Sequence, residues 1–244
     1  MRYSEADQRP AGVTESKPHA RRDSRSWFFV CMASILLVIV AVGFAKSFYL
    51  RNIIHKSHAV SSLPVYIVLH GIVLTSWFLL FLGQTSLVAY GSVRLHRAFG
   101  VAGAALATVV FALSLLVVVR SVVRETSLVV LGDIVILFLF AILVTGGIWF
   151  RQKSDVHKRL MLIASISIVA PALARWPGAQ SMLPVSVVGP QLLLYGALIL
   201  YDVLSRGRVH PATVWGVALY VVAVGVTIPL ASSNLGHALV EALK

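Results

Sequence analysis

The sequence predicts an all-α integral membrane protein, a single bundle of seven transmembrane helices. Hydrophobic residues make up 58% of the 244 residues and charged residues only 12%, which is about half the charged fraction of a typical soluble domain. The apolar residues also gather in blocks long enough to cross a bilayer, for which about 20 residues are needed. The seven blocks cover residues 27–45, 64–90, 98–119, 128–150, 160–175, 185–201 and 212–231.

The first block follows a leader, residues 1–26, that is polar, mixed in charge and without apolar periodicity. This composition predicts a disordered cytoplasmic segment whose basic end lies near the lipid headgroups. The block itself is nineteen residues long, longer than the apolar region of a signal peptide, so we expect a retained helix. Cleavage after the small residues at 43–45 is the alternative.

The distribution of lysine and arginine predicts the orientation of the bundle, residues 27–231. With the N-terminus inside, inner segments carry fourteen basic residues and outer segments seven, and basic residues are enriched in cytoplasmic loops. We therefore expect an N-in, C-out protein with residues 232–244 as a short C-terminal tail. The net charge of +12 then reflects orientation and attraction to anionic inner-leaflet lipids. Nucleic-acid binding is not expected, because the basic residues are scattered without interleaved aromatic residues.

Three later helices begin with one local pattern, an aliphatic residue, a histidine, and then Arg, Lys or Pro. The histidines are His96, His157 and His210, each at the inner start of an outward helix, so we expect one helix followed by three parallel hairpins. We interpret them as helix-start residues that accept a backbone hydrogen bond or anchor in the headgroups. A three-histidine metal site on the inner face is the alternative, because neutral imidazole is a good metal ligand.

Some of these segments resemble a known group of proteins. "LHRAFG" at 95–100, "VHKRLMLIASISIVAPALAR" at 156–175 and "LHGIVLTSWFLLFLGQ" at 69–84 resemble uncharacterised bacterial multi-pass membrane proteins. The resemblance covers about residues 58–216 and implies a location in the bacterial cytoplasmic (inner) membrane, but no activity. A more distant likeness to haem-bearing b561-type or oxidase-assembly membrane proteins rests on helix number and membrane histidines alone.

The block 64–90 carries a stripe of polar and aromatic side chains. Tyr66, His70, Trp77 and Gln84 are spaced by four, seven and seven residues, which places them on one helical face. With the N-terminus inside, His70 lies about 9 Å below the outer end of its block. Polar groups within membrane helices are costly and usually face the bundle interior.

Two other helices place polar residues at the same depth. Asp133 and Gln191 lie about 8 Å and 9 Å below the outer ends of their blocks. The backbone is predicted to be irregular at this level, because block 160–175 spans only about 24 Å of an apolar core of about 30 Å. The surrounding prolines are Pro171, Pro177, Pro184 and Pro190. Such backbone is tolerated only where protein buries it or where it lines a wet cavity.

These residues define a candidate pocket in the outer leaflet. It is built by His70, Asp133, Arg175 and Gln191, with Trp77 and Tyr66 as apolar walls and His58 of the preceding loop at its mouth. Arg175 is expected to pair with Asp133 or with an anionic ligand. The structural alternative is a buried Asp133–Arg175 pair that holds the register of the helices, with His70 bonded to a neighbouring helix.

The pocket favours the binding of a small ligand or a redox cofactor. A haem would take His70 as an axial ligand, and a quinone would form hydrogen bonds with His70 and Asp133. A proton- or cation-coupled transporter, with Asp133 as the carrier, is the first alternative. A structural or assembly factor, partnered by another membrane protein or by a second copy, is the second. The sequence leaves open whether the protein is an enzyme.

The predicted orientation has a direct test. Reporter tags on the N-terminus and within residues 151–159 should report a cytoplasmic location, and a tag on the C-terminus should report the opposite side. Paired fluorescent-protein and alkaline-phosphatase fusions measure this. A cytoplasmic C-terminus would mean an even number of crossings and would remove the basis for comparing depths.

Overall fold

The computed structural model describes residues 20–54 and 63–244, and within these residues it is helical with no strand. Seven helices of this part of the chain are long and apolar enough to cross a membrane, which confirms the predicted all-α, seven-helix fold. The elements are α1 (Ala20–Phe44), the π-helical turn η1 (Ala45–Tyr49), α2 (Arg51–Ile54), α3 (Val65–Ala89), α4 (Val93–Ser121), α5 (Ser127–Trp149), α6 (Ser154–Ser167), α7 (Ala170–Leu173), the 3-10 turn η2 (Ala179–Met182), α8 (Val185–Arg206), α9 (Pro211–Ala231) and α10 (Asn234–Glu241).

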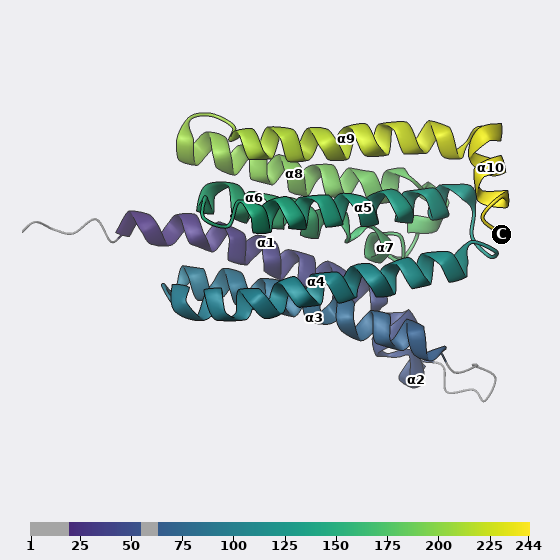
Figure 1. Ribbon diagram of the computed structural model, residues 1–244, viewed down its shortest axis with the longest axis horizontal. Helices are drawn as coiled ribbons and strands as arrows, with labels where there is room; N and C mark the ends of the chain where they lie inside the picture. The colour runs from purple at the N-terminus through teal and green to yellow at the C-terminus, as the bar shows by residue number, and fades with distance from the viewer. Residues whose placement is uncertain (1–19, 55–62) are drawn as a thin grey trace, which may run out of the picture.

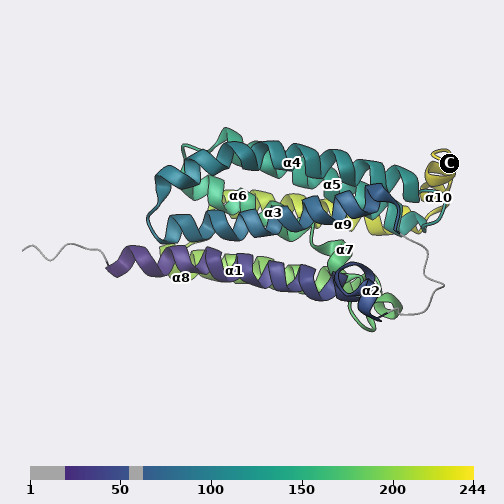
Figure 2. The same ribbon diagram turned by 90° about the horizontal axis from the view of Figure 1, so that it is seen from below.

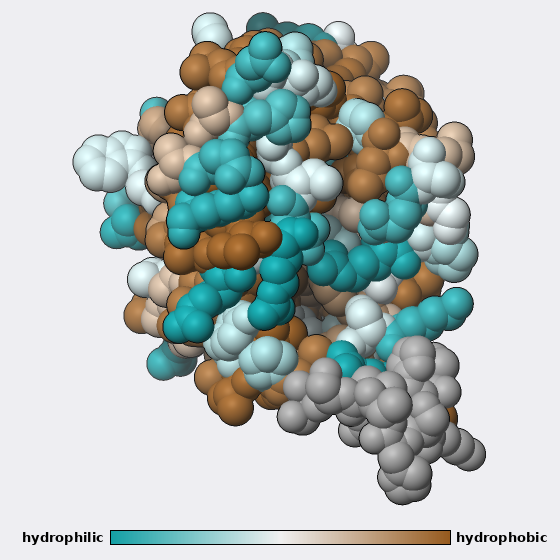
Figure 3. Space-filling model, turned by 90° about the vertical axis from the view of Figure 1, so that its right-hand side faces the viewer, coloured by the Kyte–Doolittle hydropathy of each residue, from teal (hydrophilic) through white to brown (hydrophobic). Residues whose placement is uncertain are grey.

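The long helices lie side by side along one axis (Figures 1 and 2). The connections α3–α4, α5–α6 and α8–α9 lie at the end where α1 begins, which we call the N-terminal end of the bundle. The chain finishes at the opposite, C-terminal end, just after α10. With seven crossings in the described residues, the start of α1 and the end of the chain lie at opposite ends of the bundle. Figure 3 looks onto the C-terminal end, where hydrophilic side chains gather on the end face and hydrophobic ones surround it.

Two predicted boundaries need correction. The first helix begins at Ala20, so the last residues of the expected disordered leader are already helical, while residues 1–19 lie outside the described part. The tail after residue 231 contains α10, which packs on α5 through Val240 against Val130. The side chains of Ser127 and His237 also join these two helices, with 2.8 Å between Oγ and Nδ1.

The core of the bundle lies around α6. Buried residues make up 61% of its membrane window, against 39% or less in the other six spans found in the described residues. Its neighbours are α1, α5, α8 and α9. The first two predicted hairpins, α3–α4 and α5–α6, pack closely, whereas α9 packs mainly on α5 and α6 rather than on α8. Polar side chains that point inward from α6 therefore meet several helices at once.

The α6 helix begins earlier than the apolar block that predicted it. It starts at Ser154 and continues as α7 to Leu173, so this span is 20 residues long and not short. The predicted irregularity is confirmed, because the helix is interrupted between Ser167 and Ala170. The second segment, α7, packs closely against α1. A side chain at Gly43 of α1 would collide with the backbone of Ala172.

Candidate functional site

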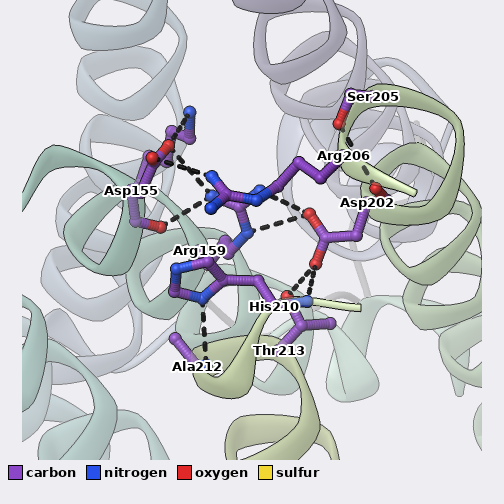
Figure 4. A network of polar contacts seen from close by, with 9 residues as sticks. Asp155, Arg159, Asp202, Ser205, Arg206, His210, Ala212 and Thr213 are labelled. Atoms are coloured by element: carbon purple, nitrogen blue, oxygen red, sulfur yellow. Dashed lines mark hydrogen bonds and ion pairs between the residues drawn. The ribbon is translucent and has the colours of Figure 1, made fainter. Parts of the chain in front are cut away.

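A buried ion pair joins two central helices at the N-terminal end of the bundle (Figure 4). Asp202, in the last turns of α8, accepts through Oδ1 from the Nε of Arg159 in α6 at 2.9 Å and from a second guanidinium nitrogen. Arg159 is 1% exposed and Asp202 is fully buried. Charges buried to this degree are stable only when they are paired and hydrogen-bonded.

The second oxygen of Asp202 fastens α9 to the same pair. Its Oδ2 accepts from the backbone nitrogen of His210 at 3.1 Å and from the hydroxyl of Thr213 at 2.6 Å. The Nδ1 of His210 in turn accepts from the backbone nitrogen of Ala212 at 3.0 Å, so His210 is the N-cap of α9. One carboxylate therefore satisfies donors from α6 and from the start of α9.

The network reaches the surface through Asp155, in the first turn of α6. The Nη1 of Arg159 donates to the backbone oxygen of Asp155 at 2.7 Å, and the Asp155 carboxylate also binds Lys158 and Arg206 at 2.6 and 2.9 Å. The Asp155 side chain is 46% exposed. Ion pairs at such an edge contribute about 0–1 kcal/mol each, because water screens them. The buried half of the network is the energetically important half.

A second polar cluster lies deeper, where α6 is interrupted. In a continuous helix the nitrogen of residue 171 would donate to the carbonyl of Ser167, but Pro171 has no N–H. The side-chain nitrogen of Gln191 takes this place, donating to the carbonyls of Ser167 and Ile166 at 3.1 and 2.8 Å. The Gln191 side-chain oxygen accepts from the hydroxyl of Tyr220 in α9 at 2.8 Å.

Tyr195 also belongs to this second cluster. We call the group of Gln191, Tyr195 and Tyr220 at the interruption of α6 the central cluster. Tyr195 lies one turn from Gln191 on α8, is 1% exposed, and its ring centre is 4.7 Å from that of Tyr220. Its hydroxyl is buried and has no hydrogen-bond partner among the described residues. A buried hydroxyl without a partner costs about 1–3 kcal/mol, so a molecule that bonded to it would recover this energy.

The predicted outer residues share one end of the bundle but do not form a contact network. His70 of α3 lies 3.5 Å from the hydroxyl of Ser114 in α4. None of the ion pairs of the described residues joins Asp133 to Arg175. Arg175 donates instead to the carbonyl of Pro171 at 2.7 Å and lies over the ring of Phe44.

The other predicted members of this pocket lie apart. Trp77 is buried in the core, where it donates to Ser165 at 3.3 Å and contacts Phe140 edge to face. Tyr66 lies under the guanidinium of Arg120, with 5.8 Å from its ring centre to Cζ. Gln191 belongs to the central cluster described above, and His58 lies outside the described residues.

Two open hollows of the described structure are lined by residues other than His70, Asp133 and Arg175. One of about 330 Å³ lies beside Ile39, Trp176 and Met182, and one of about 370 Å³ lies beside His210 and Trp215 at the N-terminal end. Both are mainly apolar. The predicted outer pocket is neither of these two hollows.

The three helix-start histidines have three different environments. His210 is an N-cap, as predicted. His157 is not a cap, because its Nδ1 contacts the carbonyl of Gly147 in α5 at 2.8 Å, and the Nδ1 of His96 is buried without a partner among the described residues. The rings of His96 and His157 lie 6.1 Å apart. Among the residues that the structure describes, no three His, Cys, Asp or Glu side chains come together to hold a metal ion.

Arg159 and Asp202 are not among the site residues that the sequence predicts. Each lies one residue outside an apolar block, and Arg159 was counted among the loop charges that predict orientation. A signal for Asp202 exists, because Gln191, Tyr195, Leu198 and Asp202 follow a helical spacing that forms one buried face of α8.

No family model, curated protein or solved structure matches the chain. The resemblance of its motifs to uncharacterised bacterial membrane proteins therefore stays a prediction, and function has to be inferred from the geometry of the polar clusters.

The ion pair can be tested by a double-mutant cycle. Asp202→Asn and Arg159→Gln should each lower the free energy of unfolding by about 3–5 kcal/mol, because each leaves an uncompensated buried charge. The double variant should recover much of that loss. Thermal unfolding in detergent measures the difference, with Asp155→Asn as the exposed control that should cost about 1 kcal/mol or less. Additive losses in the double variant would show that the two charges are independent.

The cap of α9 predicts a pH dependence. Burial, followed by the positive charges of Arg159 and Arg206, lowers the pKa of His210 below its ordinary value, although Asp202 and Asp155 oppose this. The neutral ring is the form that accepts from Ala212, so its contribution to stability is full above about pH 6.5 and is lost as the pH falls through the lower folded pKa.

Thermal unfolding of wild type and His210→Asn between pH 8 and 5 measures this contribution. Asparagine also caps helices but does not titrate, so wild type should lose stability more steeply than the variant below pH 6.5. Parallel curves would contradict the assignment of His210 as a titrating cap.

Proposed function

We propose that this protein is a secondary transporter that moves a small polar solute across the bacterial cytoplasmic membrane, coupled to protons or another cation. The observation that carries the proposal is the central cluster, in which Gln191 binds the carbonyls of Ile166 and Ser167 at the interruption of α6. In secondary transporters, substrate and ion sites lie near the middle of the bilayer, at interrupted helices. The exposed apolar sides of the bundle support a multi-pass membrane protein.

The central cluster has the depth and the chemistry of a solute site. Tyr195 and Gln191 lie about 10 and 16 Å from Asp202 along α8, at a rise of 1.5 Å per residue. The hydroxyl of Tyr195, which has no partner among the described residues, offers a donor and an acceptor to a polar solute. The two backbone carbonyls would be available to the solute or to a cation if the Gln191 amide turned away.

The ion-pair network supplies the gate that such a transporter requires. It ties α6, α8 and α9 together at the N-terminal end, between the central cluster and the surface. Protonation of Asp202 would remove the charge that holds Arg159 and would release the start of α9. We infer that this step couples proton entry to opening, with the N-terminal end facing the cytoplasm as the basic residues predict.

The resident-cofactor alternative has less support from the geometry. Trp77, one of its predicted members, is buried in the core with Ser165 as its partner, and His70 has Ser114 as its neighbour. A purely structural role would explain the ion pair. It would not explain why a buried hydroxyl is left without a partner beside an interrupted helix.

Distance measurements by pulsed electron paramagnetic resonance test the proposal without knowledge of the solute. In a Cys31→Ala background, spin labels at residues 94 and 208 span the N-terminal end, and labels at 124 and 180 span the C-terminal end. All four residues are exposed. Asp202→Asn, which mimics the protonated carboxyl, should lengthen the first distance and shorten the second, because alternating access moves the two ends reciprocally.

Asp155→Asn is the matched control, since it removes a charge from the exposed edge of the same network and should leave both distances unchanged. Two results in Asp202→Asn would contradict a transport function. One is a longer distance at the N-terminal end without a shorter distance at the C-terminal end, and the other is no change in either distance.

A further inference from the structure

We propose that the hollow of about 370 Å³ at the N-terminal end of the bundle binds one anionic phospholipid of the surrounding bilayer. Its phosphate would contact Lys153, and the first part of an acyl chain would lie between Leu160 and Trp215. The hollow is lined by the α5–α6 connection, by α6 and by the start of α9. This lipid site does not depend on the proposed transport function.

Exposed aromatic residues place the hollow at the level of the lipid headgroups. Trp149 at the end of α5 and Trp215 in the second turn of α9 are 78% and 76% exposed. Tyr90, just after α3, is also exposed, and its ring centre is 5.4 Å from that of Trp27 near the start of α1. These positions all belong to the N-terminal end of the bundle. Tryptophan and tyrosine gather where a bilayer meets water, so the hollow beside Trp215 opens at that boundary.

Apolar side chains form most of the wall of the hollow. Phe150 follows α5, Leu160 lies in the second turn of α6, and Trp215 projects from α9. Acyl carbons cover such a surface favourably, because apolar surface is then removed from water. The volume of about 370 Å³ lies in the range of small-molecule sites, about 300–1,000 Å³. It admits part of one acyl chain rather than a whole lipid.

Lys153 supplies a positive charge at the edge of this apolar wall. It lines the hollow, and its Nζ lies 5.6 Å from the ring centre of Phe150, another lining residue. None of the ion pairs of the described residues includes Lys153. Its ammonium group is therefore available to a phosphate without the loss of an existing ion pair.

The two connections beside the hollow carry an excess of positive charge. Residues 150–160 and 202–212 contain six basic and two acidic side chains. Both carboxylates are already paired, Asp155 with Lys158 and Arg206, and Asp202 with Arg159. A phosphate beside Lys153 thus meets no unpaired carboxylate from these connections. Basic pockets between membrane helices bind anionic headgroups, so a lipid with a net negative charge fits better than a zwitterionic one.

Native mass spectrometry of the full chain in detergent tests the role of charge. The protein is titrated with dioleoylphosphatidylglycerol, which is anionic, and with zwitterionic dioleoylphosphatidylcholine. Wild type should bind one phosphatidylglycerol about 5-fold more tightly than phosphatidylcholine or better, because one basic residue near a membrane surface contributes about that factor. Lys153→Gln should weaken phosphatidylglycerol binding about 5-fold and leave phosphatidylcholine binding unchanged.

Arg94→Gln is the matched control for charge, since Arg94 is exposed at the same end in α4 and lies outside the lining. It should leave both affinities unchanged. Trp215→Ala should weaken the binding of both lipids, because it removes a wall of the hollow. Its matched control is Trp149→Ala, which removes an equally exposed tryptophan outside the lining and should have no such effect.

Thermal unfolding separates a lipid from a free phosphate compound. Phosphatidylglycerol should raise the unfolding temperature of wild type and of Arg94→Gln more than that of Lys153→Gln, because a ligand of the folded state stabilises it. Glycerol 3-phosphate, which has the phosphate but no acyl chain, should not raise it. Equal affinity of wild type for the two lipids would overturn the proposal. So would equal losses in either variant and its matched control, or equal stabilisation by glycerol 3-phosphate.

Discussion

A charged or polar group inside an apolar bundle is stable when other groups of the protein form hydrogen bonds with it. In this molecule both carboxylate oxygens of the buried Asp202 have such partners. Its carboxylate accepts from Arg159 of α6, from the backbone of His210 and from the hydroxyl of Thr213. Because no water competes in the bundle interior, these contacts fix which helices are neighbours at the N-terminal end. The packing of α9 on α6, and the position of the α8–α9 connection, depend on them.

The same constraint explains the middle of the bundle. Pro171 removes a donor from the helix, and Gln191 supplies the replacement from α8, so the interruption of α6 is stable only while α8 stays in place. Asp202, Tyr195 and Gln191 lie on one face of α8, which connects the ion pair mechanically to the central cluster. A change at Asp202 therefore reaches the interrupted helix through one rigid element, and this is the physical basis of the proposed coupling.

The sequence was sufficient for the features that depend on local composition. Seven apolar blocks gave seven helices, and the prolines after residue 170 gave the irregular backbone. His210 followed local capping rules. Pairing across the bundle was not accessible in this way, because Arg159 and Asp202 are 43 residues apart in the chain and lie at the edges of apolar blocks. The expected Asp133–Arg175 contact is not among the ion pairs of the described residues, where Arg175 donates to the carbonyl of Pro171 instead. The depth of a residue in the membrane can be predicted from its position in one helix. Contact between two residues also depends on how their two helices are rotated toward each other.

Hydrogen–deuterium exchange followed by mass spectrometry tests the central role of Asp202 most directly. Backbone amides at the end of α8 and at the start of α9 should exchange faster in Asp202→Asn than in wild type, because the carboxylate that binds Arg159, Thr213 and the His210 nitrogen is gone. Amides of α10 and of the α3–α4 connection should be unaffected. Unchanged exchange at the α8–α9 connection, or a uniform increase throughout the bundle, would contradict the view that this carboxylate holds the N-terminal end together.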